Sequence, residues 1–476
     1  MDAALTAFES YRKVTGERRG AFLEAIAIGL EDAGEWLIEL ASSETNLALP
    51  RLKGEMARTC FQLRMFAQLA REGNWVEPII NHANPSKNPP APDLRSMLIP
   101  LGPVVVFGAS NFPFAYSTAG GDSASALAAG CPVVVKQHPA HPETSLRVFE
   151  MMKNAAAQTG MPEGVVHHVA DEGFMTGKAL VQHPYAAAVG FTGSYQGGMA
   201  LLEYSRQRQK PIPVFAEMGS VNPVFLLPGA LQANGAEIAQ KMVPSITASM
   251  GQFCTNPGLM FGLRSHALDA FAQSLAGGLN QIVGAPMLHS GIEKAFEQKA
   301  KEALGQQGVK LLTSQPLRDG GPLPGAMLAT IGAHGFVANP RVHEEIFGPW
   351  SLLVVCESKD ELVACRRALS GQLTTTFWGT DEDFANCPGL IDEALYQAGR
   401  VVFNGVPTGV EVCAAMVHGG PHPATTDSRF TAVGPLSVRR WARPVSWQNA
   451  PAKLLPPALQ DHNPLNLLRL VDGQWI

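Results

Sequence analysis

Between residues 101 and 218 the sequence alternates short apolar runs with segments of helical character, and this alternation constrains the fold more than any other feature. The apolar runs are PVVVFGA, CPVVVK, GVVHHVA, AAAVGFTG and IPVFAE. Helical patterns fill the intervals, over residues 114–130, 143–160, 173–182 and 194–205. Continuous apolar strands separated by helices are typical of a parallel sheet that is covered on both faces. The segment therefore predicts a doubly wound α/β domain.

Other regions flank this segment. The first eighty residues have helical periodicity, in which Phe22, Ile26 and Leu30 recur at steps of four. The stretch NHANPSKNPPAPDLRSMLIP that follows is rich in proline and has little periodicity, so we expect an extended arm there. A second α/β series starts near Pro223 and runs to about residue 410. The tail from His418 onward is rich in Pro and Arg.

Composition and charge exclude several classes of protein. Hydrophobic residues make up 46% of the chain and charged residues 16%, a balance that excludes disorder for most of it. The net charge of -5 and the lack of a basic face argue against a nucleic-acid partner. No run of about 18 apolar residues and no signal peptide is visible, so we expect no membrane partner. The 7 cysteines lack CxxC spacing, which favours reduced thiols in the cytoplasm and predicts neither disulfides nor a metal site.

Cys254 is a candidate nucleophile. It lies in MGQFCTNPG, a loop between a predicted helix and a predicted strand. Backbone amides at such a loop can stabilise a thiolate and an oxyanion. A small buried hydrophobic residue is the alternative for a single cysteine, and the residues alone leave both interpretations open.

Two polar residues at strand ends are further catalytic candidates. Glu217 ends the strand IPVFAE, at the edge where parallel α/β sheets bind ligands, and it could act as a general base. It could equally cap the next turn. Asn111 follows a strand in FGASNFPFA, and its amide could donate to an oxyanion or only begin a helix.

A cofactor site is indicated near two other strand ends. Lys136 ends CPVVVK, where a lysine could bind a ribose or a phosphate. The segment GFTGS lies between a strand and a helix, and its glycines would let a phosphate approach the helix N-terminus. Because the segment is not GxGxxG, its spacing alone is weak evidence for a dinucleotide.

Taken in order, these motifs form a series that resembles the aldehyde dehydrogenase superfamily. The series consists of SNFPFA, VVVKQHPAHPETS, GFTGS, AEMGSVNPVF, GQFCTN and HEEIFGPW. The resemblance extends from about residue 5 to the C-terminus. Within the superfamily, AGGDSASALAAGCPVVVK and KQHPAHPETS are most similar to the branch of α-ketoglutaric semialdehyde dehydrogenases and NADP-linked fatty aldehyde dehydrogenases. One departure is EMGS, with Ser220 where the family usually has glycine.

The resemblance implies a catalytic role for three residues. The Cys254 thiolate would attack the aldehyde carbon, and the Asn111 amide with the Cys254 backbone N–H would hold the oxyanion. After hydride transfer, Glu217 would activate the water that hydrolyses the thioester. The predicted product is a carboxylate.

The resemblance also implies cofactor contacts. Lys136 would hold the adenosine ribose, Gly193 and Ser194 would lie under the pyrophosphate, and Glu345 with Phe347 would hold the nicotinamide and its ribose.

The loop after Lys136 bears on the choice between NADP and NAD. Family members that prefer NAD commonly have an acidic residue three positions after this lysine, where Pro139 stands here. We therefore predict that NADP is preferred, with NAD possible. His138 is the candidate contact for the 2′-phosphate, although it could also be a solvated loop residue.

The family fold implies a domain organisation. Residues 1–80 and 100–218 would form a Rossmann-like cofactor-binding domain, and residues 219–417 an α/β catalytic domain. Residues 81–99 and 418–476 would form an oligomerisation arm and tail. A homodimer or homotetramer is expected, because the low charged fraction suits a surface that is partly covered.

The substrate is the most open question. A dicarboxylic semialdehyde needs a cation for its distal carboxylate, and Arg58 or Arg64 could supply it, with Gln62 four positions after Arg58 on the same helical face. Phe112 and Phe253 could line the tunnel. We predict α-ketoglutaric semialdehyde, with a medium- or long-chain fatty aldehyde as the alternative. A cofactor-free cysteine acyltransferase or thioesterase and a non-catalytic relative are rivals from other classes.

Overall fold

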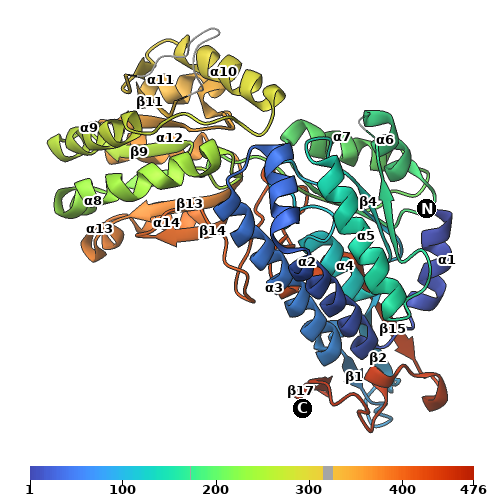
Figure 1. Ribbon diagram of the computed structural model, residues 1–476. Coiled ribbons are helices and arrows are strands. Elements are labelled where there is room, and N and C mark those ends of the chain that lie inside the picture. The colour runs from blue at the N-terminus through green and yellow to red at the C-terminus, as the bar shows by residue number, and fades with distance from the viewer. Residues whose placement is uncertain (172, 315–324) are drawn as a thin grey trace.

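Three β-sheets organise the chain, which the computed structural model describes over residues 1–171, 173–314 and 325–476. Figure 1 shows two lobes side by side, one carrying α2 to α7 and the other α8 to α14. The third sheet extends from the lower end of the N-terminal lobe, near the C-terminus.

The sheet of the N-terminal lobe is parallel throughout and has the strand order β5-β4-β3-β6-β7. Its strands are β3 (Val104–Phe107), β4 (Val133–Lys136), β5 (Val166–Val169), β6 (Ala188–Thr192) and β7 (Val214–Glu217). The chain winds outward from β3 in both directions, so a crevice forms at the carboxyl ends of β3 and β6. The predicted doubly wound sheet is confirmed.

Helices cover both faces of this sheet. They are α1 (Asp2–Tyr11), α2 (Gly16–Thr45), α3 (Leu49–Glu72), α4 (Gly121–Ala129), α5 (Pro142–Gln158), α6 (Phe174–Gln182) and α7 (Tyr195–Arg206), with a 3-10 turn at Asn74–Val76. Val104 and Val106 belong to one core with residues of α2 to α5, whereas Val105 packs with residues of α6 and α7. Because every position of β3 is covered, its sequence is apolar without alternation.

The helix expected over residues 114–130 is wrong in its first half, since α4 begins only at Gly121. The buried Glu55 carboxylate accepts hydrogen bonds from the backbone N–H groups of Phe114 (2.8 Å) and Ala115 (3.0 Å). These bonds hold the chain in turns before Gly121. The small residues of the segment are compatible with a helix, and a tertiary contact overrides them.

The sheet of the second lobe has the order β10-β11-β12-β9-β8-β13-β14, with β10 antiparallel and the other strands parallel. Its strands are β8 (Val224–Leu226), β9 (Leu259–Leu263), β10 (Lys310–Leu311), β11 (Met327–Gly332), β12 (Trp350–Cys356), β13 (Gln372–Trp378) and β14 (Ala398–Phe403). Two apolar cores cover its two faces.

The helices of the second lobe are α8 (Pro228–Thr247), α9 (His266–Asn280), α10 (Ser290–Leu304), α11 (Ala333–Ala338), α12 (Lys359–Arg367), α13 (Asp381–Ala385) and α14 (Pro388–Ala394). Short 3-10 turns lie at Ala248–Gly251 and Pro340–His343. In the part of the chain that the structure describes, no helix is both long and apolar enough to cross a bilayer.

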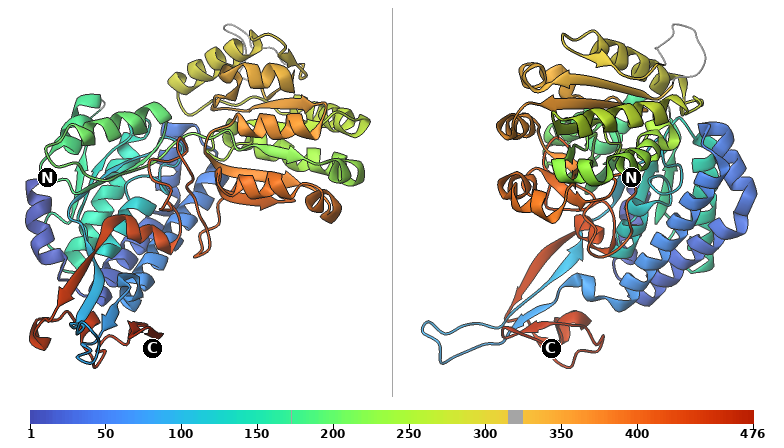
Figure 2. Two further views of the ribbon diagram at one scale, coloured as in Figure 1. Left: turned by 180° about the vertical axis from the view of Figure 1, so that it is seen from behind. Right: turned by 90° about the vertical axis from the view of Figure 1, so that its left-hand side faces the viewer.

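The third sheet joins the proline-rich stretch to the tail, in the order β15-β2-β1-β16-β17. Its strands are β1 (Ile79–Asn81), β2 (Leu94–Pro100), β15 (Ala442–Gln448), β16 (Leu470–Val471) and β17 (Gln474–Trp475). The 3-10 turns of the tail are Pro435–Trp441, Ala452–Leu454 and Pro457–Leu459. Figure 2 shows the light-blue loop between β1 and β2 projecting far from the lobes.

The second lobe is an insertion within the first, so the chain passes between them twice. On its return, the segment at residues 424–426 runs antiparallel to the end of β7. Met218 N donates to Ala424 O (2.8 Å), and Thr426 N donates to Ala216 O (3.1 Å). The two crossing segments are therefore hydrogen-bonded to each other beside Glu217.

A buried ion pair ties the tail to the N-terminal lobe, and breaking it is expected to destabilise the protein. Arg440 donates to Asp122 (2.6 Å), and Trp441 Nε1 donates to Ser125 (2.7 Å). Arg440→Met would leave the Asp122 carboxylate buried without its partner, which typically costs about 3–5 kcal/mol. Urea unfolding monitored by tryptophan fluorescence measures this change. Arg147→Met is the control because its pairs are exposed, and an equal loss of stability in both variants would contradict the expectation.

Candidate active site

The candidate catalytic residues meet where the two lobes face each other. Glu217 is the last residue of β7, and Asn111 lies in the loop after β3, both at the carboxyl edge of the first sheet. Cys254 lies in the loop before β9, and Glu345 in the segment before β12, at the amino edge of the second sheet. The site therefore exists only when the two lobes are docked.

Cys254, Glu217 and His418 form a compact cluster at this interface. Their reactive atoms all lie within 4.8 Å of one another. His418 Nε2 is 2.9 Å from Glu217 Oε1 and 3.6 Å from Cys254 Sγ. The Glu217 and His418 side chains are both 2% exposed, and the structure shows no well-aligned hydrogen bond to either Glu217 oxygen among the described residues. His418 therefore contacts both the thiol and the carboxylate, and the thiol also lies close enough to Glu217 to interact with it directly.

The surroundings of Cys254 keep its thiol protonated in the free protein. Burial of the sulfur and the nearby Glu217 carboxylate raise the pKa of Cys254 well above its usual value, and Arg58 opposes this shift. A thiol of this kind needs a proton acceptor before it can attack. The Nε2 atom of His418 is within reach of that proton.

The Cys254 loop is held in a strained conformation. Ser249, Met250 and Gly251 have φ angles of 49°, 55° and 65°, in the left-handed region. A side chain at Gly251 would collide with the backbone of Gly348, since a Cβ atom would lie 2.2 Å from it. Strain of this kind gathers at active sites, where the surrounding contacts enforce it.

Asn222 fixes the loop from the other side. Its Nδ2 donates to Cys254 O (2.8 Å) and to Asn256 O (2.9 Å). Asn222 itself has a φ of 44°.

Asn111 is positioned beside the same loop. Its Nδ2 donates to Gln252 O (3.0 Å), and its backbone carbonyl oxygen accepts from Arg51 (2.6 Å). The adjacent rings of Phe112 and Phe253 meet edge to face, 5.4 Å apart. An amide nitrogen carries two hydrogens, so the bond to Gln252 still leaves one for an oxyanion.

The N-terminus of α7 is open to an anion. Gly193 and Ser194 are exposed, and the Ser194 hydroxyl accepts from Gly197 N as the helix cap. A Cβ atom at Gly193 or Gly197 would lie within 3 Å of the Phe191 ring, so only glycine allows the backbone this close. Lys136 ends β4 at the same edge of the sheet. These residues fit a dinucleotide pyrophosphate over the helix.

His138 is a neutral residue in the loop after β4. Its ring stacks on His141, and its Nδ1 accepts from Ala140 N (3.0 Å). Burial of the ring lowers the pKa of His138 to about 3. It can therefore offer only an uncharged N–H at Nε2 to a phosphate. Pro139, the next residue, is exposed.

Glu345 and Phe347 lie between the Cys254 loop and the start of β8. A Cβ atom at Gly219 would lie 2.0 Å from Glu345 Oε2, and burial of this carboxyl group raises the pKa of Glu345 to about 7. Phe347 shares a small cavity with Phe253 and Ser220.

Arg58 and Arg400 reach the site from opposite lobes. Arg58 donates to Val410 O (2.8 Å), while Arg400 donates to Gly409 O (2.8 Å) on the same segment. Both guanidinium groups are close enough to Cys254 to interact with it electrostatically.

The other two polar candidates for substrate binding lie elsewhere on α3. Gln62 is buried beside the first turn of α4, and its Nε2 has no hydrogen-bond partner among the described residues. Arg64 instead pairs with Glu31 at the surface (2.5 Å).

Sequence reasoning missed His418 and Arg400 as site residues. His418 begins HGGPHPATT, a glycine- and proline-rich segment without periodicity, and Arg400 lies within a strand. The glycines beside His418 were the one available signal of a close backbone approach.

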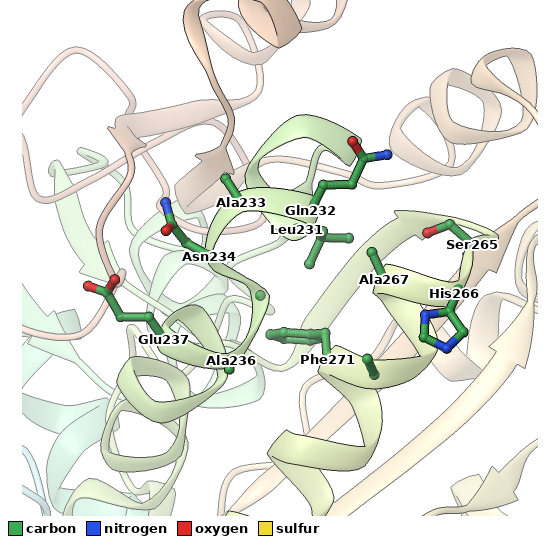
Figure 3. Close-up of a pocket in the computed structure, with 12 residues that line it drawn as sticks. Leu231, Gln232, Ala233, Asn234, Ala236, Glu237, Ser265, His266, Ala267 and Phe271 are labelled. Carbon is green, nitrogen blue, oxygen red and sulfur yellow. The ribbon is translucent and has the colours of Figure 1, made fainter.

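A cleft of about 760 Å³ lies away from this cluster, between α8 and α9. Figure 3 shows Phe271 and Leu231 at its centre, with Asn234, Glu237 and His266 at its rim. It contains none of the candidate residues.

Comparisons with known proteins agree with this architecture. The model of the aldehyde dehydrogenase family matches residues 1–429. Alpha-ketoglutaric semialdehyde dehydrogenase 2 of Azospirillum brasilense is 46% identical, over 99% of this chain and 90% of the relative. The alpha-ketoglutaric semialdehyde dehydrogenase of Acinetobacter baylyi is 44% identical, with the same two shares.

Solved structures share the fold at lower identity. Betaine aldehyde dehydrogenase of Staphylococcus aureus superposes with a TM-score of 0.79 at 21% identity, over 94% of this chain and 87% of the other. An NADP dependent enzyme of E. coli gives a TM-score of 0.79 at 21% identity, over 94% and 88%.

Proposed function

This chain belongs to the aldehyde dehydrogenase family, and we propose that it oxidises α-ketoglutaric semialdehyde to α-ketoglutarate through a thioester on Cys254. As a family member it is an oxidoreductase that converts an aldehyde to a carboxylic acid with NAD(P). The observation that carries the proposed mechanism is the cluster of Cys254, His418 and Glu217. A cofactor-free acyltransferase and a non-catalytic protein are not favoured by this membership.

Acylation begins with proton transfer from Cys254 to His418. The thiol gives its proton to Nε2, and the imidazolium that forms faces Glu217 Oε1 at 2.9 Å. Because that carboxylate is buried, the ion pair stabilises the charge created by the transfer. The thiolate then attacks the aldehyde carbon, while the Asn111 amide and the Cys254 backbone N–H donate to the oxyanion. Glu345 and Phe347 would hold the nicotinamide, which would supply the hydride acceptor. Loss of the hydride from the former aldehyde carbon would leave a thioester on Cys254.

Glu217 acts as the general base in deacylation. Its oxygens have no well-aligned partner among the described residues, so one is available to accept a proton from water. The water attacks the thioester carbon, and the thiolate departs as the carboxylate product forms.

The loop after β4 supports a preference for NADP over NAD. No carboxylate stands at position 139, and the Lys136 ammonium at the end of β4 favours a phosphate. His138 would add a neutral N–H donor. One of the structural neighbours, the E. coli protein, is described as NADP dependent.

Placing a carboxylate at position 139 is expected to reverse the cofactor preference. Pro139→Glu would repel the 2′-phosphate of NADP and accept from the 2′-hydroxyl of NAD, lowering kcat/KM for NADP relative to NAD by about 10-fold, equivalent to about 1.4 kcal/mol. Initial rates with each cofactor measure the ratio. Pro139→Gln has a similar side chain without charge and should leave the ratio unchanged. An equal loss of kcat/KM with both cofactors would show that this loop does not determine which cofactor is preferred.

Arginine side chains from both lobes lie near Cys254, and their positive charges support the assignment of a substrate with a distal carboxylate. Arg58 and Arg400 interact electrostatically with Cys254, and they are held in place by the same segment at residues 407–410. Gln62 would add an amide donor, and Phe112 with Phe253 would flank the aliphatic carbons. The two curated relatives named above as semialdehyde dehydrogenases agree with this assignment.

Removing the Arg58 charge is expected to impair carboxylate-bearing substrates more than uncharged ones. Arg58→Met should lower kcat/KM for α-ketoglutaric semialdehyde by about 100-fold, within the 2–5 kcal/mol typical of a buried charge pair that loses one partner. The rate with an uncharged medium-chain aldehyde should fall much less, because there only the effect of Arg58 on the pKa of Cys254 is lost. Arg64→Met is the matched control on the same helix, since Arg64 pairs with Glu31 at the surface. Equal losses of kcat/KM with both aldehydes would contradict a role for Arg58 in binding the distal carboxylate.

The direct test of the function is formation of reduced nicotinamide by the purified protein. The expected result is cysteine-dependent reduction of NADP that is faster with α-ketoglutaric semialdehyde than with a medium-chain aldehyde. Activity with the apolar aldehyde alone would assign a fatty aldehyde dehydrogenase, and reduction of neither cofactor would overturn the proposal.

We also propose a homodimer or homotetramer in the cytoplasm. The tail exposes large apolar side chains, with Leu454 67%, Trp475 65% and Ile476 59% exposed, which a second subunit could cover. All 7 cysteines are free, as expected in a reducing compartment. Light scattering coupled to size exclusion measures the assembly.

A further inference from the structure

We propose that Cys254, His418 and Glu217 form a binding site for a zinc ion that reversibly masks the nucleophile. Thiolate, imidazole and carboxylate are three of the ligand types that zinc prefers. Their donor atoms lie within 4.8 Å of one another, which is the arrangement that one ion can bridge. The sequence predicted no metal site, because the three ligands are far apart in the chain and have no motif spacing.

The distances in the cluster agree with zinc coordination. Zinc bonds of about 2.3 Å to sulfur and about 2.05 Å to nitrogen, at a tetrahedral angle, separate the two atoms by about 3.6 Å. The distance between Cys254 Sγ and His418 Nε2 is 3.6 Å. Glu217 Oε1 is 2.9 Å from the same nitrogen, so it needs to move by only about 0.5 Å to complete the set.

The state of the Glu217 carboxylate is independent evidence for a ligand. The residue is 3% exposed, and neither oxygen has a well-aligned hydrogen bond among the described residues; the polar groups that face it are His418 Nε2, 2.9 Å from Oε1, and the Cys254 thiol, which are the other two members of the cluster. A buried carboxylate without such bonds is costly, and a divalent cation would satisfy it. Each catalytic step proposed above uses only one carboxylate oxygen of Glu217. In the resting enzyme, both oxygens therefore remain without a well-aligned hydrogen bond.

Binding would involve no redox step. The Cys254 S–H bond breaks, its proton passes to solvent, and a bond forms from sulfur to zinc, while an imidazole nitrogen of His418 and a carboxylate oxygen of Glu217 bind through existing lone pairs. Three protein ligands leave the fourth tetrahedral position to water. A thiolate in this state cannot attack an aldehyde, and a chelator that removes the ion would restore it. The inference rests on the cluster alone and stands whichever aldehyde is the substrate.

The first test measures zinc bound by the full-length protein without any reaction. The protein is dialysed against buffered Zn²⁺, and bound metal is determined by elemental analysis. We expect one zinc ion per chain in the wild type. Cys413→Ser removes an exposed thiol outside the cluster and should also bind one ion. Cys254→Ser and His418→Ala should each weaken binding by more than about 100-fold, since second-shell changes alone cost about 10- to 100-fold. Far-ultraviolet circular dichroism checks that each variant is folded.

A second measurement reports the ligands directly. Co²⁺ in place of zinc should give a thiolate-to-cobalt charge-transfer band in the wild type, in Cys413→Ser and in His418→Gln at high metal, but none in Cys254→Ser. Zn²⁺ should also protect Cys254 from alkylation by iodoacetamide, as mapped by mass spectrometry. Absence of zinc binding in the wild type, or stoichiometric binding retained in folded Cys254→Ser, would overturn the proposal. Neither result would bear on aldehyde oxidation, which is measured without added metal.

Discussion

Replacing Cys254 with serine is expected to abolish aldehyde oxidation, with kcat/KM falling by about 10⁴-fold or more. A serine hydroxyl is far less acidic than a thiol, so His418 cannot generate a comparable nucleophile from it. The geometry of the loop should survive, because Asn222 holds it through backbone carbonyls of residues 254 and 256. Initial rates of reduced nicotinamide formation, compared at equal protein concentration, measure the loss.

Cys413→Ser provides the matched control for this substitution. Cys413 is an exposed thiol on the segment that leads to His418, outside the cluster. Its replacement should leave turnover at the wild-type level. Substantial activity in Cys254→Ser, with Cys413→Ser inactive, would show that the nucleophile has been assigned to the wrong cysteine.

Glu217→Gln is expected to separate the two halves of the reaction. His418 contacts the thiol directly, so acylation should still occur, although more slowly than in the wild type because the imidazolium loses its ion pair with Glu217, and it should release one equivalent of reduced cofactor per site in a burst. Water is then no longer activated, and steady-state turnover should fall by about 10²- to 10⁴-fold. Stopped-flow absorbance resolves the burst from the slow phase that follows.

Two additions make this experiment specific. Hydroxylamine, which attacks thioesters without a general base, should restore turnover in Glu217→Gln and yield a hydroxamate. Glu357→Gln, at an exposed carboxylate paired with Arg264, should behave as the wild type. If Glu217→Gln gives no burst and hydroxylamine has no effect, the ion pair with His418 is essential for acylation and the assignment of Glu217 as the base for deacylation is unsupported.

The parts of this molecule that local patterns control were predictable from its sequence. The apolar runs of β3 to β7 predicted a parallel sheet because a strand covered on both faces has no alternation. Glu217 and Asn111 were candidates because each follows such a strand, where polar residues face a crevice. Lys136 and the GFTGS segment were found by the same reasoning.

The remaining parts depend on contacts between distant segments. His418 lies 164 residues from Cys254 in the chain, and the two meet only because the chain returns alongside β7. The helix expected from residue 114 fails because of Glu55, about 60 residues earlier. Arg400 lies in a strand whose sequence shows nothing of the loop it holds. No local pattern reports such convergence.

The paired crossing segments have a mechanical consequence. They run side by side between the lobes, bonded to each other through residues 216–218 and 424–426, and are placed to act as a hinge. Glu217 lies on one strand of that hinge and His418 just before the other. Points on a rotation axis move least, so the lobes could swing apart at their far ends to admit a dinucleotide while the proton-transfer distances near the axis stay almost constant. The opening of the lobes and the proton-transfer chemistry therefore take place in different parts of the molecule.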